Sequence, residues 1–164
     1  MTLLLSTLST PIGNLNLIAD EHVLLAANLS NLKALKESLS QEDSEKTIKS
    51  VSRIPIITDL IGDYFDGDLA ALNAISVRQP GAHFSQEAWK AMKKVKAGKV
   101  ISYGELAERA GSPAAVRAAG SACAKNAIVL IVPCHRIVKT GGALGNYAYG
   151  LDKKAWLLRH EGAL

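Results

Sequence analysis

The sequence Ile128-Val129-Leu130-Ile131-Val132-Pro133-Cys134-His135-Arg136 joins a continuous apolar run to a cysteine, a histidine and an arginine. An apolar run of this length, bounded by Asn126 and Pro133, predicts a buried strand that ends at Cys134. The thiolate is the nucleophilic form of cysteine, and neighbouring cations lower the pKa of a thiol. We therefore interpret Cys134 as a candidate nucleophile. The alternative is a buried structural cysteine.

Two short helices are predicted upstream of this run. Ser102-Tyr103-Gly104-Glu105 has the pattern of a capping box, so a helix should begin there and end near Ala110. Ser112-Pro113 then predicts the start of a second helix, which should continue to about Lys125. Two short helices joined by a tight, glycine-containing turn indicate a helix-turn-helix.

The second of these helices consists almost entirely of small residues. Between Pro113 and Ala122 the one long side chain is Arg117, and Cys123 follows as a candidate structural cysteine. Major-groove reading requires several long polar side chains, which this helix lacks. Small residues instead allow close approach to a backbone or a groove wall. We expect DNA binding with little sequence preference, and the alternative is a core helix with a solvated arginine.

The first half is predicted to be a scaffold of strands and helices. Three short apolar runs predict strands joined by hairpin turns, at Leu3–Leu8, Leu15–Ala19 and Val23–Ala27. Helical spacing predicts helices over residues 31–39 and Ile56–Phe65, and the polar segment Ser40–Ser50 predicts a loop. A boundary near Gln79-Pro80-Gly81 divides the chain into domains 1–80 and 81–164.

Composition excludes several classes of protein. Of the 164 residues, 48% are hydrophobic and 21% charged, which supports a buried core. No apolar run approaches the roughly 20 residues that span a bilayer. Two cysteines cannot form a disulfide framework, and the absence of a CxxC pattern argues against a zinc site. We expect a cytoplasmic, monomeric protein without a metal, a cofactor or a membrane segment.

The charge is unevenly distributed. Residues 1–85 contain six Lys and Arg against ten Asp and Glu, and residues 86–164 contain thirteen against five. A basic second half suggests nucleic acid as a partner, although a solvated basic surface would look the same.

The second half of the chain contains further candidate positions. A helix after Ser85 is predicted to place Trp89, Met92 and Val95 on one buried stripe. Gly141–Gly150, with four glycines and two tyrosines, predicts a loop that lines a pocket and lies against a flat ring. The helix that follows is predicted to be capped by Asp152. Glu161 lies in its last turn, where the helix dipole disfavours a carboxylate. We interpret Glu161 as a partner of a histidine, against the alternative of a solvated glutamate.

Taken together, these motifs resemble the O6-alkylguanine-DNA alkyltransferase family. The resemblance is carried by Asn126, Ile131–Val138, Gly145-Asn146-Tyr147 and Trp156-Leu157-Leu158-x-His160-Glu161-Gly162. It covers residues 85–162 closely, and the first half fits more loosely through Thr10-Pro11-x-Gly13 and Tyr64-Phe65-x-Gly67. It implies an α/β N-terminal domain with a small antiparallel sheet, and a mostly helical C-terminal domain with a helix-turn-helix of winged-helix type.

The resemblance also implies an activity. The protein would repair DNA by transferring an alkyl group from O6-alkylguanine to Cys134, once per molecule and without a cofactor. His135, held by Glu161, would deprotonate the thiol through a water molecule. Asn126 would brace the turn around Cys134. Tyr103 would assist protonation of the departing guanine and contact the phosphate of the target nucleotide.

The remaining implied roles concern DNA. The helix-turn-helix would enter the minor groove of double-stranded DNA, and Arg117 would fill the stack after the target nucleotide has been flipped out. Further implied DNA contacts are Ala115, Ala118, Gly120 and Ser121. The implied pocket residues are Val138, Asn146, Tyr147 and Ala148. Ala148 stands where relatives often carry serine, and substrate preference could differ at this position. The sequence does not indicate how large an alkyl group the pocket accepts or whether O4-alkylthymine is also repaired.

Two other functions are compatible with the same residues. A non-catalytic DNA-binding lesion or redox sensor would bind duplex DNA and respond to oxidation of Cys134 without transferring an alkyl group. A cysteine hydrolase using Cys134, His135 and Glu161 would turn over thioesters or peptides. Residues adjacent in sequence seldom face each other well enough to form such a dyad.

Overall fold

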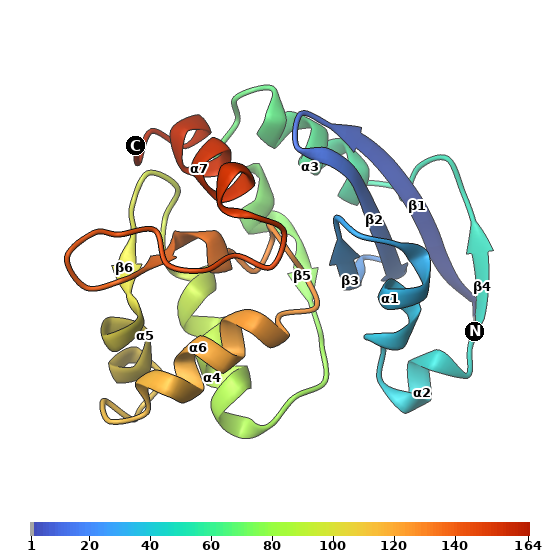
Figure 1. The fold of residues 1–164 in the computed structure, drawn as a ribbon. Coiled ribbons are helices and arrows are strands. Elements are labelled where there is room, and N and C mark those ends of the chain that lie inside the picture. Colours follow the sequence, from blue (N-terminus) through green and yellow to red (C-terminus); the bar gives the residue numbers. More distant parts are fainter. Residues whose placement is uncertain (1) are drawn as a thin grey trace. The chain divides into compact units, whose positions relative to one another are not determined.

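The computed structural model describes residues 2–164 and divides into two compact units (Figure 1). One unit comprises Met1–Pro80 with Ala127–Ile131, and the other comprises Gly81–Asn126 with Val132–Leu164. Within residues 2–164, no helix is both long enough and apolar enough to cross a membrane.

The first unit is built on a five-stranded mixed sheet with the order β4-β1-β2-β3-β5. Its strands are β1 (Thr2–Thr10), β2 (Gly13–Asp20), β3 (Val23–Asn28), β4 (Thr47–Ser50) and β5 (Ser76–Val77). The first three strands confirm the predicted hairpins. The sheet is not purely antiparallel, because β4 and β5 pair parallel with β1 and β3. Both edge strands arrive through longer connections rather than hairpins, and such connections permit parallel pairing.

Helices accompany this sheet. They are α1 (Leu32–Glu37), α2 (Gln41–Ser44), α3 (Ile57–Phe65) and the 3-10 helix η1 (Ala71–Ala74). Helices α1 and α3 confirm the two predicted helices. The prediction of a loop over Ser40–Ser50 is wrong, because that segment contains α2 and β4. The Ser40 side chain caps α2 by accepting a hydrogen bond from Asp43 N, and the carboxylate of Asp43 pairs with Lys46 and Arg78.

The second unit is mostly helical. Its helices are α4 (His83–Lys93), α5 (Tyr103–Arg109), α6 (Val116–Lys125), α7 (Leu151–His160) and the 3-10 helix η2 (Cys134–Arg136). Strands β6 (Ile101–Ser102) and β7 (Ile137–Val138) form a two-stranded parallel ladder. The predicted stripe of Trp89, Met92 and Val95 is buried. The indole nitrogen of Trp89 donates to Ala122 O (2.9 Å), which ties α4 to α6.

The structure confirms the predicted start of α5 but not those of α6 and α7. The capping box of α5 is present, with the Ser102 side chain accepting from Glu105 N at 3.0 Å. Helix α6 begins at Val116, later than predicted, because Ala115 N donates to Ser112 O and closes a turn there (2.9 Å). The N-cap of α7 is Gly150, so the prediction that Asp152 caps this helix is wrong.

The apolar run before Cys134 is buried, but it is not a strand. Ile128 makes a single bridge to Ala27 on β3, and the chain then turns. Leu130 has a φ of 76°, and Ile131 N donates to Val129 O across it (2.9 Å). Such a turn interrupts any continuing ladder, so the run serves as a buried connection.

The capping box generates a stability prediction. Ser102→Ala removes the side-chain acceptor for Glu105 N, and we expect a loss of about 1 kcal/mol. Ser112→Ala is the matched control, because Ser112 does not cap α6, and it should change stability by less than about 0.5 kcal/mol. Urea unfolding monitored by Trp fluorescence measures both. Equal losses in the two variants would contradict the cap assignment.

Candidate active site

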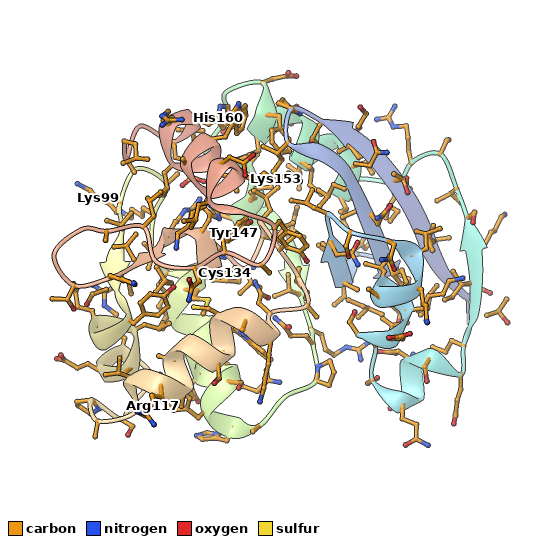
Figure 2. All side chains as sticks on the ribbon, viewed as in Figure 1. Lys99, Arg117, Cys134, Tyr147, Lys153 and His160 are labelled. Atoms are coloured by element: carbon orange, nitrogen blue, oxygen red, sulfur yellow. The ribbon has the colours of Figure 1, made fainter. Side chains whose placement is uncertain are left out.

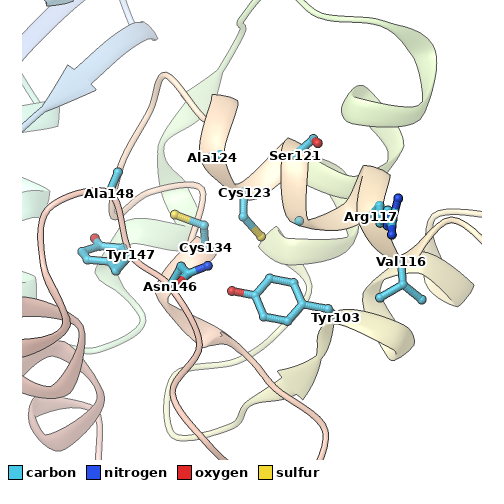
Figure 3. A pocket seen from close by; sticks show the side chains of 11 residues that line it. Tyr103, Val116, Arg117, Ser121, Cys123, Ala124, Cys134, Asn146, Tyr147 and Ala148 are labelled. Atoms are coloured by element: carbon cyan, nitrogen blue, oxygen red, sulfur yellow. The ribbon is translucent and has the colours of Figure 1, made fainter.

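A cavity of about 600 Å³ in the second unit is lined by Cys134 (Figure 3). Helix α6 supplies small residues along one wall, among them Gly120 and Ala124. The loop before α7 supplies Asn146, Tyr147 and Ala148, and Tyr103 at the start of α5 completes the lining. The predicted glycine-rich loop therefore does line a pocket.

The backbone around Cys134 is held by a shared carbonyl. Cys134 N donates to Val132 O (2.8 Å), and the side-chain amide of Asn126 donates to the same oxygen (2.8 Å). Asn126 lies just after α6, so this hydrogen bond ties the end of that helix to the turn that carries the thiol. The side chain thus braces the turn, as the resemblance implied.

Cys134 is 9% exposed, and its thiol is not activated in the way that the sequence suggested. Burial raises the pKa of Cys134, although a hydrogen bond with Asn126 and the charge of Lys154 act in the opposite direction. The expectation of a lowered pKa assumed that the adjacent cationic side chains face the sulfur. In the structure both face Glu161 instead. Cys134 is therefore a neutral thiol at rest and needs a base.

His135, Arg136 and Glu161 form a buried network. The His135 Nε2 donates to Glu161 Oε2 (2.8 Å), and Arg136 donates to both carboxylate oxygens through Nε (2.8 Å) and Nη2 (2.9 Å). Burial raises the pKa of Glu161, but the hydrogen bonds from His135 and Arg136 outweigh it and hold that pKa well below the usual range. The predicted pairing of Glu161 with a histidine is present.

This network leaves His135 suited to accept a proton. Its side chain is completely buried, and burial lowers its pKa, so the imidazole is neutral near pH 7. With Nε2 donating to Glu161, Nδ1 is the acceptor nitrogen. Among residues 2–164, no side chain or backbone group hydrogen-bonds to Nδ1.

Lys154 is a buried cation near the thiol that the sequence reasoning did not identify. It is 0% exposed, and its ammonium donates to Ile137 O (2.6 Å) and Asn146 O (3.1 Å). It therefore fixes the pocket loop, and its charge favours the thiolate of Cys134. The signal in the sequence was its position on the buried face of α7, three residues before Leu157 and four before Leu158.

The side chain of Tyr103 lies in the pocket and packs closely against Gly145. A Cβ at Gly145 would lie 2.9 Å from the Tyr103 hydroxyl, so the close approach requires glycine, whose φ is +76°. Burial raises the pKa of Tyr103, which keeps the hydroxyl protonated and able to donate.

The residues predicted to contact DNA lie on or beside α6. Arg117 is exposed near its first turn, and Gly120 and Ser121 line the pocket wall. Ala115 is the N-cap, and Ala118 is half-buried. Val138 is not among the residues that line this pocket, and it pairs with Ser102 in the β6–β7 ladder. Figure 2 shows Arg117, Cys134 and Tyr147 in the same unit.

Comparisons with known proteins agree on one family. The family model "6-O-methylguanine DNA methyltransferase, DNA binding domain" matches residues 83–163. The chain is 36% identical to methylated-DNA–protein-cysteine methyltransferase of Salmonella typhimurium, over all of this chain and 98% of that protein. It is 37% identical to the Homo sapiens protein of the same name, over 96% of this chain and 79% of that protein.

A solved structure extends the likeness to the fold. The structure of Mycobacterium tuberculosis OGT in complex with DNA matches with a TM-score of 0.81 and 31% identity. It covers 98% of this chain and 93% of that one. The chain belongs to the methylated-DNA–protein-cysteine methyltransferase family.

Proposed function

We propose that this protein repairs DNA by transferring an alkyl group from O6-alkylguanine to Cys134, once per molecule. The observation that carries the proposal is a buried thiol in a cavity of about 600 Å³, next in sequence to a neutral histidine whose other nitrogen is fixed by a buried carboxylate. Membership of the methyltransferase family supports the same reaction.

The proposed chemistry needs one base and one proton donor. His135 Nδ1 takes the proton of Cys134 through a water molecule, and the thiolate attacks the alkyl carbon. The carbon–sulfur bond forms as the bond to O6 breaks, and the electron pair of that bond goes to the guanine. A proton from the Tyr103 hydroxyl would neutralise the negative charge on the departing guanine. The proton lost by the thiol would then replace the one that Tyr103 gave up, so the net charge of the site is unchanged. The thioether product has no leaving group, so the protein is consumed.

The proposed DNA contact follows from the shape of α6. A lesion at O6 lies inside the stacked duplex, so the nucleotide must be flipped into the pocket. Small residues along α6 allow that helix to enter the minor groove, and Arg117 would occupy the vacated stack. Contacts of this type read little sequence. Helices α5 and α6 would act together as the helix-turn-helix of a winged-helix domain.

The proposal assigns the two parts of the chain different tasks. Residues 1–80 would be a scaffold domain, and residues 81–164 would carry both DNA binding and transfer. All pocket-lining residues belong to the second of these segments. We also propose that the protein is cytoplasmic, and that it is monomeric because one pocket with one acceptor suffices for one transfer.

The first experiment measures the mass of the intact protein after incubation with a duplex that carries one O6-methylguanine. We expect wild type to gain one methyl group and Cys134→Ser to gain none. Tryptic mapping should place the methyl on Cys134. An unmodified wild type that still prefers the lesion duplex over undamaged DNA would instead indicate a lesion sensor.

The pKa of His135 generates a pH prediction. Burial holds the pKa of His135 below 6.5, so the imidazole is neutral above that pH. Proton transfer from the neutral thiol to the neutral imidazole then takes up no proton from solvent. The transfer rate should therefore be level from about pH 7 to pH 8.5. The rate should fall at lower pH as His135 becomes protonated. His135→Gln keeps a donor for Glu161 but no base, so its rate should rise about tenfold per pH unit. A level profile in this variant would remove His135 from proton transfer.

Arg117 generates a prediction about the duplex. Arg117→Ala should slow transfer from a duplex lesion about tenfold, because the flipped state loses the side chain that fills the stack. Transfer from the same lesion in a single strand should slow much less. Lys125→Ala is the matched control, since it removes a cation from the other end of α6. Equal slowing on both substrates would assign Arg117 to general DNA attraction.

A further inference from the structure

The two cysteines of the chain line the same pocket, and the proposed transfer uses only one of them. Cys134 comes from η2 and Cys123 from α6. Figure 3 shows both side chains in the pocket, with the Cys123 sulfur on the side of Tyr103 and the Cys134 sulfur on the side of Ala148, so a bond between them requires a rotation of a cysteine side chain. The chain has no other cysteine. Cys123 is therefore a second thiol in the pocket that has no role in the proposed transfer.

A short series of hydrogen bonds links the two cysteine backbones. Asn126 N donates to Cys123 O (3.3 Å), and the Asn126 side chain donates to Val132 O (2.8 Å). Cys134 N donates to that same oxygen (2.8 Å). Asn126 thus holds the end of α6 against the turn that carries Cys134. The backbone segments of the two cysteines are therefore fixed relative to each other by hydrogen bonds.

The two thiols interact electrostatically but differ in character. Burial and the nearby Cys134 together raise the pKa of Cys123 to about 12, against the opposing charge of Lys154. Cys123 is therefore protonated at neutral pH and does not compete for the alkyl group. It is also the more exposed of the two, half-buried where Cys134 is buried.

We propose that Cys123 is a resolving thiol, which forms an intramolecular disulfide with Cys134 after Cys134 has been oxidised by a peroxide. In the first step the Cys134 sulfur attacks one peroxide oxygen, the O–O bond breaks, and a sulfenic acid and water are formed. In the second step the Cys123 sulfur attacks the sulfenic sulfur and expels water. One peroxide is reduced by two electrons, and two thiols are oxidised to one disulfide.

The charges of the pocket suit the first step, and in the second step the proton of Cys123 leaves with the hydroxyl of the sulfenic acid as water. Lys154 favours the anionic form of each sulfur, and His135 is the base that the first step requires. The competing fate of a sulfenic acid is further oxidation to sulfinic acid, which thiols do not reverse. A resolving thiol in the same pocket intercepts the sulfenic acid before that occurs.

The disulfide is also arranged for reversal. A reducing thiol attacks the more accessible sulfur, which is that of Cys123, and Cys134 is then the leaving group. Reduction in this direction regenerates the acceptor. The disulfide itself does not depend on the alkyl-transfer reaction, but its consequence, a reversible block of repair, rests on the proposed function.

The test uses hydrogen peroxide and intact-protein mass spectrometry on the full chain. Wild type is treated with a small excess of peroxide, quenched with iodoacetamide and digested without reduction. We expect a loss of two hydrogens per chain, no alkylated cysteine, and a peptide that links Cys123 to Cys134. Dithiothreitol should then restore methyl transfer to the level of the untreated protein.

Two variants make the outcome decisive. Cys123→Ser, compared with its own untreated sample, should gain two or more oxygen atoms on Cys134, as sulfinic or sulfonic acid, and this oxidised fraction should not recover methyl transfer with dithiothreitol. Cys134→Ser should show no disulfide within the chain. Oxygen atoms on wild-type Cys134 without a link to Cys123, or a link between two chains, would overturn the proposal. The mass change is read without a DNA substrate, so failure of the disulfide is distinguishable from failure of alkyl transfer.

Discussion

The buried carboxylate of Glu161 is the constraint on which the second unit depends. A carboxylate removed from water is destabilised by several kcal/mol unless hydrogen-bond donors, at least one of them charged, surround it. His135 and Arg136 supply these donors, and Arg136 also donates to Val95 O (2.7 Å). The end of α7, the turn of η2 and the segment after α4 are thereby joined at one charge. Because the carboxylate orients His135, the same interaction that stabilises this unit also fixes the direction of its proton acceptor.

The reactivity of Cys134 follows from that arrangement. Burial keeps the thiol protonated, so the sulfur does not react merely because it is present. In the proposed reaction the sulfur becomes nucleophilic when His135 takes its proton, and the charge of Lys154 favours the resulting anion. The cations next to Cys134 in the sequence are engaged by Glu161, so the charge that acts on the sulfur comes instead from α7, twenty residues further along the chain.

The pocket wall explains the composition of α6. Gly120 and Ala124 leave room for a large, flat group, and Gly145 lets the ring of Tyr103 approach the opposite loop. Small residues on one helix thus serve two purposes in the proposed function, which are close approach to DNA and space for the flipped base. Cys123 is part of the same wall. Its side chain is small, and its thiol is the group that would form the proposed disulfide with Cys134.

By itself the sequence determined those features that depend on neighbouring residues. The β1–β3 hairpins and the capping box at Ser102 follow from local patterns, and the motif around Cys134 was sufficient to identify the family. The tertiary structure alone decided the turn at Leu130, the late start of α6 and the direction of the pKa shift of Cys134. It also brought Lys154 and Cys123 to the acceptor. The physical reason is that desolvation and charge–charge interactions depend on which side chains pack together, and residues distant in sequence set that packing.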